Sequence, residues 1–127
     1  MYLSYRYIWA GSLPNLSYKG WSTLQPRYAV AHMPSQRTTT SVRVGSDLYQ
    51  GTMQVALDAQ GVYFECPLRL PANKMMHIPY NRFKLLELPK ARTGFLAIRT
   101  YGIFQVDGVD IWLDDPYASQ IIAQLAP

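Results

Sequence analysis

The stretch of sequence that decides the fold is residues 103–125, IFQVDGVDIWLDDPYASQIIAQL. Its first half places VDGV, residues 106–109, between two apolar runs. Asp-Gly in that setting predicts a two-residue type I′ turn, and hence a hairpin over residues 103–113. The second half predicts an amphipathic helix over residues 116–126, and the apolar face of this helix must pack against a sheet. The stretch therefore predicts an α+β domain.

The start of this helix follows from three residues. Asp115 precedes Pro116, which gives an acidic N-cap and a proline at the first helical position, where its missing N–H does no harm. Asp114 adds negative charge near the positive end of the helix dipole. The predicted apolar face consists of Tyr117, Ala118, Ile121, Ile122 and Leu125.

Upstream of the hairpin, the hydrophobic period is two. Turn residues separate short strands predicted at residues 38–44, 52–57, 62–66, 75–79, 82–88 and 94–100. The segment Asp58–Gly61 fits a type I turn closed by a left-handed glycine. Leu85, Leu86 and Leu88 are predicted to belong to the core. The fold class that buries such a set is α+β, mostly β: an antiparallel split barrel or strongly curved sheet closed by the C-terminal helix.

The N-terminal part of the chain has a different character. Residues 20–31 predict a short helix, because Trp21, Leu24 and Tyr28 recur at helical spacing, with Pro26 at its start or at a kink. Residues 1–19 are rich in tyrosine and predict an extended aromatic arm, with a short strand over residues 3–9. The length of 127 residues matches one domain, so we expect the arm 1–19 and a single domain over 20–127.

Several short motifs carry a resemblance to a known family. They are GVYF at 61–64, PLR at 67–69, HIPY at 77–80, RF at 82–83 and Gly20-Trp21-x-x-Leu24-x-x-x-Tyr28. Through them, residues 18–125 resemble a family of small uncharacterised bacterial proteins of pleckstrin-homology-like (PH/GRAM-like) character. The resemblance implies a PH-like barrel and no agreed activity, so it bears on the fold more than on the function.

Composition excludes several classes of protein. Lone Cys66 is incompatible with a disulfide framework and predicts a reducing, cytoplasmic location. No apolar run is long enough for a transmembrane segment, and Arg6 interrupts the nearest approach to a signal peptide. Two histidines and one cysteine, without clustered spacing, predict neither a metal site nor a cofactor.

Charge is distributed in blocks along the chain, with a net charge of +4. Residues 1–46 and 69–99 are basic, whereas residues 47–68 and 100–127 are acidic. Such blocks indicate either an anionic partner or strands of opposite sign lying side by side. In the first case, the candidate anion-binding residues are Arg69, Lys74, Arg82 and Lys84. The partner would be anionic lipid at a peripheral membrane surface or, less favoured, nucleic acid.

No motif of a catalytic nucleophile or of a phosphate or dinucleotide site is present in the sequence. The one enzyme hypothesis uses His77 as a general base, with Glu65 facing it across two paired strands. We favour a protein that is not an enzyme: a binding or scaffolding module acting through protein contacts. Tyr5, Tyr7 and Trp9 of the arm are its candidate interaction surface. Either the arm docks on a second copy, which predicts a homodimer, or it folds back on its own sheet as an extra edge strand.

Overall fold

The computed structural model describes residues 20–67, 69, 71–93 and 98–125. The aromatic arm 1–19, with its predicted strand at 3–9, lies outside these residues. The described elements are α2 (Trp21–Tyr28), β1 (Thr38–Val44), β2 (Asp47–Leu57), β3 (Gly61–Glu65), η1 (Pro71–Asn73), β4 (Met75–Pro79), η2 (Tyr80–Arg82), β5 (Lys84–Thr93), β6 (Ile98–Val106), β7 (Val109–Asp114) and α3 (Tyr117–Leu125).

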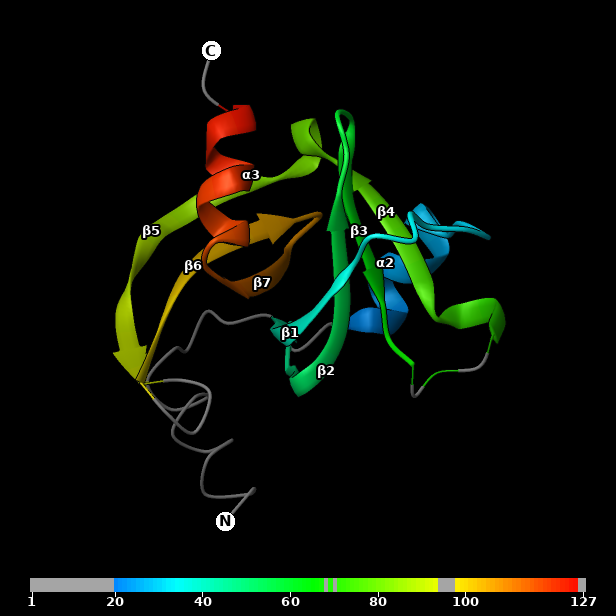
Figure 1. Cartoon of the computed structure of the whole chain (residues 1–127), viewed down its shortest axis with the longest axis horizontal. Coiled ribbons are helices and arrows are strands. Elements are labelled where there is room, and N and C mark those ends of the chain that lie inside the picture. Colours follow the sequence, from blue (N-terminus) through cyan, green and yellow to red (C-terminus); the bar gives the residue numbers. More distant parts are fainter. Residues whose placement is uncertain (1–19, 68, 70, 94–97, 126–127) are drawn as a thin grey trace.

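Seven strands form one antiparallel sheet in the order β4-β3-β2-β1-β7-β6-β5. The sheet curls into a half-barrel, with α3 packed against the β5–β6–β7 part and α2 beside β4 (Figure 1). This arrangement confirms the predicted fold class: α+β, mostly β, with a strongly curved antiparallel sheet and a C-terminal helix.

The main core lies between the inner face of the sheet and the two α-helices. Alternation along the strands points every second side chain inward. The largest side chains of the core include Trp21 and Leu24 from α2, Phe64 and Met76 from β3 and β4, Phe104 and Ile111 from β6 and β7, and Ile121 from α3. Ala118 is also fully buried, so α3 docks through the face that the sequence predicts.

The hairpin between β6 and β7 has the predicted turn. Both central residues have positive φ, 50° at Asp107 and 82° at Gly108, which is the type I′ conformation. Asp107 also reaches α2, because its carboxylate accepts a hydrogen bond of 2.5 Å from the Tyr28 hydroxyl. The turn therefore joins the C-terminal end of α2 to the far side of the sheet.

The turn between β2 and β3 corrects one prediction. Gly61 does not have the left-handed φ expected of it, since the described glycines with positive φ are Gly45, Gly51 and Gly108. Gly61 is required for space instead: a Cβ at this position would lie 2.3 Å from the carbonyl oxygen of Ile78 on β4.

Strand and helix boundaries differ from the predictions where packing overrides local pattern. Residues 98–106 form one continuous strand, whereas the sequence predicted two; Gly102 lies in its middle under Ala118 of α3. β5 continues through Pro89 instead of ending at residue 88, as a terminal strand of the sheet permits.

Both helices begin elsewhere than predicted. α2 starts at Trp21 and passes through Pro26, so the alternative of a start at Pro26 is wrong. α3 starts at Tyr117, one residue after the predicted position. Asp115 still caps it, because its carboxylate accepts hydrogen bonds from the backbone N–H of Ser119 at 3.0 Å and from its hydroxyl at 2.8 Å.

Candidate functional site: a polar strip on the sheet and two exposed leucines

Titratable side chains gather on the outer face of β2, β3 and β4. The register places Gln54 opposite Glu65 and Tyr63 opposite His77, while Phe64 between them points into the core. Alternation therefore brings polar side chains of three strands to the same face. We call this group the polar strip; its members are Arg37, Gln54, Asp58, Tyr63, Glu65, Lys74 and His77.

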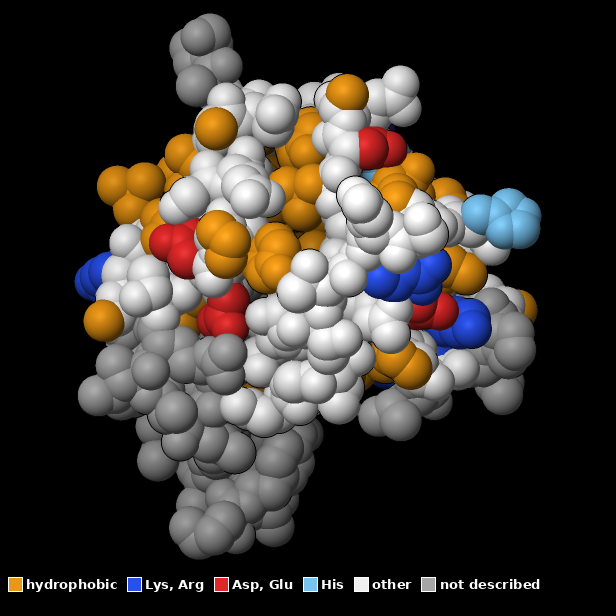
Figure 2. Space-filling view, in the orientation of Figure 1, with side chains coloured by type: hydrophobic (Ala, Val, Ile, Leu, Met, Phe, Trp, Pro, Cys, Tyr) orange, Lys and Arg blue, Asp and Glu red, His pale blue; other side chains and the backbone are white. Residues whose placement is uncertain are grey.

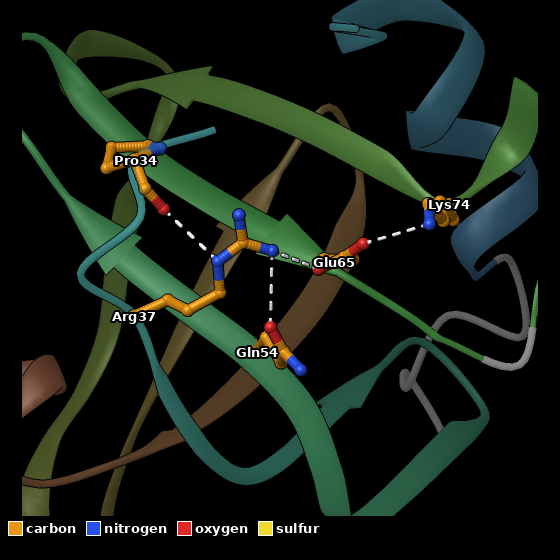
Figure 3. Close-up of polar contacts among 5 residues, drawn as sticks. All are labelled: Pro34, Arg37, Gln54, Glu65 and Lys74. Atoms are coloured by element: carbon orange, nitrogen blue, oxygen red, sulfur yellow. Dashed lines mark hydrogen bonds and ion pairs between the residues drawn. The ribbon is translucent and has the colours of Figure 1, made fainter. Parts of the chain in front are cut away.

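Glu65 is the centre of one half of the polar strip (Figure 3). Its side chain is 9% exposed, and its two oxygens are in different ion pairs, Oε1 with Arg37 at 2.5 Å and Oε2 with Lys74 at 3.3 Å. Arg37 also donates to the side-chain oxygen of Gln54 at 3.3 Å and to the carbonyl of Pro34 at 3.1 Å. The carboxylate thus links the segment before β1 to the start of β4.

His77 is the centre of the other half. Its ring packs on Tyr63 with a centroid separation of 4.2 Å, and its Nε2 lies 3.4 Å from Oδ1 of Asp58. The predicted His77–Glu65 pair is wrong: β3 and β4 do pair, but Glu65 faces Met75 and its oxygens contact cations. Asp58, at the β2–β3 turn, is the carboxylate beside this histidine.

Asp58 is held by several donors at once. Burial alone would raise its pKa, but hydrogen bonds from the backbone N–H groups of Gln60 and Gly61, both 2.9 Å, and the contact with His77 lower the pKa below its ordinary value. Burial and the Asp58 charge raise the pKa of Tyr63. The Asp58 carboxylate therefore uses its hydrogen bonds to close the turn, and it is poorly placed to activate a nucleophile.

The four candidate anion-binding residues differ in their surroundings. Arg69 donates to the Tyr49 hydroxyl at 2.8 Å and lies 3.8 Å from Asp47, and Lys74 pairs with Glu65. Arg82, the last residue of η2, and Lys84, the first residue of β5, are both exposed. Two of the four are thus paired with acids. Binding of an anion by this set stays a prediction.

Asp47 is a structural residue that the sequence analysis missed. Its Oδ2 accepts a hydrogen bond of 3.2 Å from the backbone N–H of Trp21 at the start of α2, and it also faces Arg69. Burial raises the pKa of neighbouring Tyr49 to about 12. The sequence carries no signal for this contact, because Asp47 and Trp21 are 26 residues apart.

Two leucines on β5 are exposed, contrary to the prediction that they belong to the core. Leu86 is 40% and Leu88 is 64% exposed, while Leu85 is half-buried. The pairing of β5 with β6 shifts register twice, between Leu85 and Glu87 and again between Glu87 and Lys90, so each leucine lies within a bulge. Bulges turn side chains away from the regular ladder. We call Leu86 and Leu88 the leucine pair.

Charge on the molecular surface is mixed. On the face drawn in Figure 2, Lys and Arg side chains lie beside Asp and Glu side chains rather than forming one continuous basic field. The described residues contain no group of three or more His, Cys, Asp or Glu that could hold a metal ion. They also contain no helix of the length and apolar character needed to cross a membrane. Tyr5, Tyr7 and Trp9 lie outside the described residues.

Comparison with known proteins finds no relative. No family model matches the chain, and neither a curated protein nor a solved structure matches it. The resemblance to the PH-like bacterial family therefore stays a prediction that rests on the short motifs quoted above.

Proposed function

We propose that this chain is a non-catalytic protein-binding module that contacts its partner through the leucine pair of β5. The observation that carries the proposal is the coincidence of the two exposed leucines with the two register shifts of that strand. Leu86 and Leu88 are two residues apart, so a strand directs both of them to the same face. Both leucines are exposed on β5, and at a surface an apolar side chain gains free energy only by contacting a partner.

The residues around the leucine pair define the chemistry of the partner. Lys84 and Lys90, both exposed, flank it on the same strand. A complementary surface therefore has an apolar centre and acidic side chains at its rim. The exposed parts of the two leucines together amount to about one leucine side chain, so covering them contributes about 2 kcal/mol, or roughly 30-fold in Kd.

The polar strip supports the non-catalytic part of the proposal. Glu65 is engaged by two cations, and Asp58 by two backbone N–H groups and His77. Groups that satisfy one another in this way stabilise a sheet face, whereas a general base needs an accessible, correctly placed lone pair. The cytoplasmic location is part of the same proposal and rests on lone Cys66, a buried free thiol.

The experiment compares Leu86→Ser/Leu88→Ser with a matched control, Lys84→Ser/Lys90→Ser, after confirming by circular dichroism that both fold. Partners that copurify with the wild-type chain from its host are identified, and their affinities for each purified variant are measured. We expect the leucine variant to lose about 30-fold in affinity, and the lysine variant to weaken association in a salt-dependent manner. Partners that bind the leucine variant as tightly as the wild type would overturn the proposal.

The same variants separate the alternatives. Sedimentation of the wild-type chain reveals whether the partner is a second copy, in which case the leucine variant should be monomeric. Retention on vesicles of anionic lipid or on heparin, lost on Arg82→Glu/Lys84→Glu but kept by the leucine variant, would replace protein binding with binding of an anionic surface.

A further inference from the structure

The two bulges of β5 shorten the strand relative to its neighbour. Lys84 is opposite Gln105 and Lys90 is opposite Tyr101, so six residue steps on β5 cover the length of four steps on β6. The two extra residues fall within the bulges that contain the leucine pair. At about 3.3 Å for each step on β6, the backbones of Lys84 and Lys90 are only about 13 Å apart. The leucine pair therefore lies between two lysines at a short, defined separation.

The outer edge of β5 is unsuited to the addition of another strand. β5 is a terminal strand of the sheet, with β6 on one side and no described strand on the other (Figure 1). An added strand needs regularly spaced N–H and C=O groups along this edge, but Pro89 has no N–H and each bulge breaks the spacing. Lysines, prolines and bulges are features by which edge strands avoid pairing with other chains. We therefore expect a partner of β5 to bind without extending the sheet.

The exposed apolar surface of β5 is narrow. Leu86 is 40% and Leu88 is 64% exposed. On β6, the side chains opposite this part of β5, Tyr101 and Ile103, are both buried. The apolar target is therefore about one strand wide and, over two residue steps, at most about 7 Å long. A partner reaches such a target with a single row of apolar side chains.

Charged side chains define the ends and the centre of this target. Lys84 and Lys90 are exposed at its two ends, and Glu87 is exposed between them. Charge complementarity favours an acidic side chain of the partner at each end and disfavours one at the centre. The acidic side chains of the partner should therefore be about 13 Å apart, with apolar side chains between them.

We infer that the leucine pair binds an amphipathic α-helix with two apolar residues one turn apart and an acidic residue beyond each of them. This inference rests on the proposed function of the leucine pair. Residues four apart on a helix lie on one face and about 6 Å apart along its axis, which matches the leucine pair. Acidic residues about nine or ten apart match the two lysines. A helix also satisfies its own backbone hydrogen bonds, so it needs none from the interrupted edge of β5.

The experiment measures the binding of fluorescent synthetic peptides to the full chain by anisotropy. The probe is a helix stapled on its far face, with leucines four residues apart and glutamates about ten residues apart on either side of them. The matched control peptide has a proline between the leucines and no staple. We expect the probe to bind the wild-type chain, and to bind the Leu86→Ser/Leu88→Ser variant about 30-fold more weakly. The proline peptide should bind the wild-type chain about 100-fold more weakly than the probe.

A charge exchange tests the role of the two lysines. The probe should bind the Lys84→Glu/Lys90→Glu variant more weakly than the wild-type chain, and a peptide with lysines in place of its two flanking glutamates should restore binding to this variant. Circular dichroism confirms first that each variant folds.

Three results would overturn the inference. They are the absence of binding of the probe to the wild-type chain, equal affinities of the proline peptide and the probe, and no preference of the Lys84→Glu/Lys90→Glu variant for the lysine peptide. If native partners still need the leucine pair, these results leave the proposed function standing. Native partners that bind the Leu86→Ser/Leu88→Ser variant as tightly as the wild type instead refute the proposed function, and this inference with it.

Discussion

Gly61→Ala is a direct test of how closely β3 and β4 approach at the turn that carries the polar strip. A Cβ at position 61 would lie 2.3 Å from the Ile78 carbonyl oxygen and 2.9 Å from Nε2 of His77. Separations below 3.0 Å are essentially never found for real Cβ atoms, so β4 would have to move by about 0.7 Å relative to β3. The obstructing carbonyl belongs to backbone that is paired in the sheet.

The size of the expected loss of stability depends on which atom the new Cβ would meet. Overpacking usually costs about 1–3 kcal/mol, and an obstacle of paired backbone places Gly61→Ala near the upper end, at about 3 kcal/mol. For a domain of this size, that corresponds to a fall in Tm of roughly 10 °C. The matched control is Gly51→Ala, where nothing lies within 4 Å and only the strain of a φ of +67° is added. We expect that control to lose about 1 kcal/mol.

Urea unfolding monitored by circular dichroism gives the free energy of unfolding of each variant, and an unchanged m-value confirms that the comparison is sound. The double variant Gly61→Ala/His77→Ala tells the two obstructing groups apart. Because the nearer obstacle is the Ile78 carbonyl, removing the histidine ring should not restore stability. The reasoning is wrong if the double variant recovers, or if Gly61→Ala loses no more than Gly51→Ala.

Two further predictions concern the charges of the polar strip. Glu65→Gln removes both ion pairs and should lower the free energy of unfolding by about 1–2 kcal/mol. This is below the cost for a fully buried pair, because both cations are about one-third exposed. The exposed control Lys90→Gln should change the free energy of unfolding by less than about 0.5 kcal/mol in the same urea assay. Asp58, whose pKa is lowered from 3.8, stabilises the fold above that value and loses this contribution as pH falls through its folded pKa. Asp58→Asn should therefore lose less stability than the wild type between about pH 5 and pH 2, and parallel pH profiles of the urea midpoint would contradict the assignment.

Features encoded by neighbouring residues were predictable from the sequence. The Asp107-Gly108 turn depends on two adjacent residues that tolerate positive φ, and the structure has both. The carboxylate of Asp115 caps α3 from four residues away. The curved sheet was also predictable, because a series of short strands and one amphipathic helix can bury their apolar faces in only a few arrangements.

Features that depend on register were not predictable from the sequence. Pairing β3 with β4 was expected, yet a shift of two residues along the strands decides whether Glu65 faces His77 or Met75. The bulges of β5 have no local signature either, so Leu86 and Leu88 resembled core residues. The role of Gly61 belongs to the same class, because the atom that excludes a side chain comes from another strand.

Contacts between residues far apart in the sequence also explain the blocks of charge along the chain. Each observed Arg or Lys ion pair joins a basic block to an acidic one; the pairs are Arg27–Asp107, Arg37–Glu65, Arg69–Asp47 and Lys74–Glu65. Folding thus brings blocks of opposite sign side by side, the second of the two interpretations that the sequence allowed, and weakens the case for a broad anionic partner. Lys84 and Lys90 lie outside these pairs and beside the leucine pair. Their charge is therefore available to select a partner with an acidic rim.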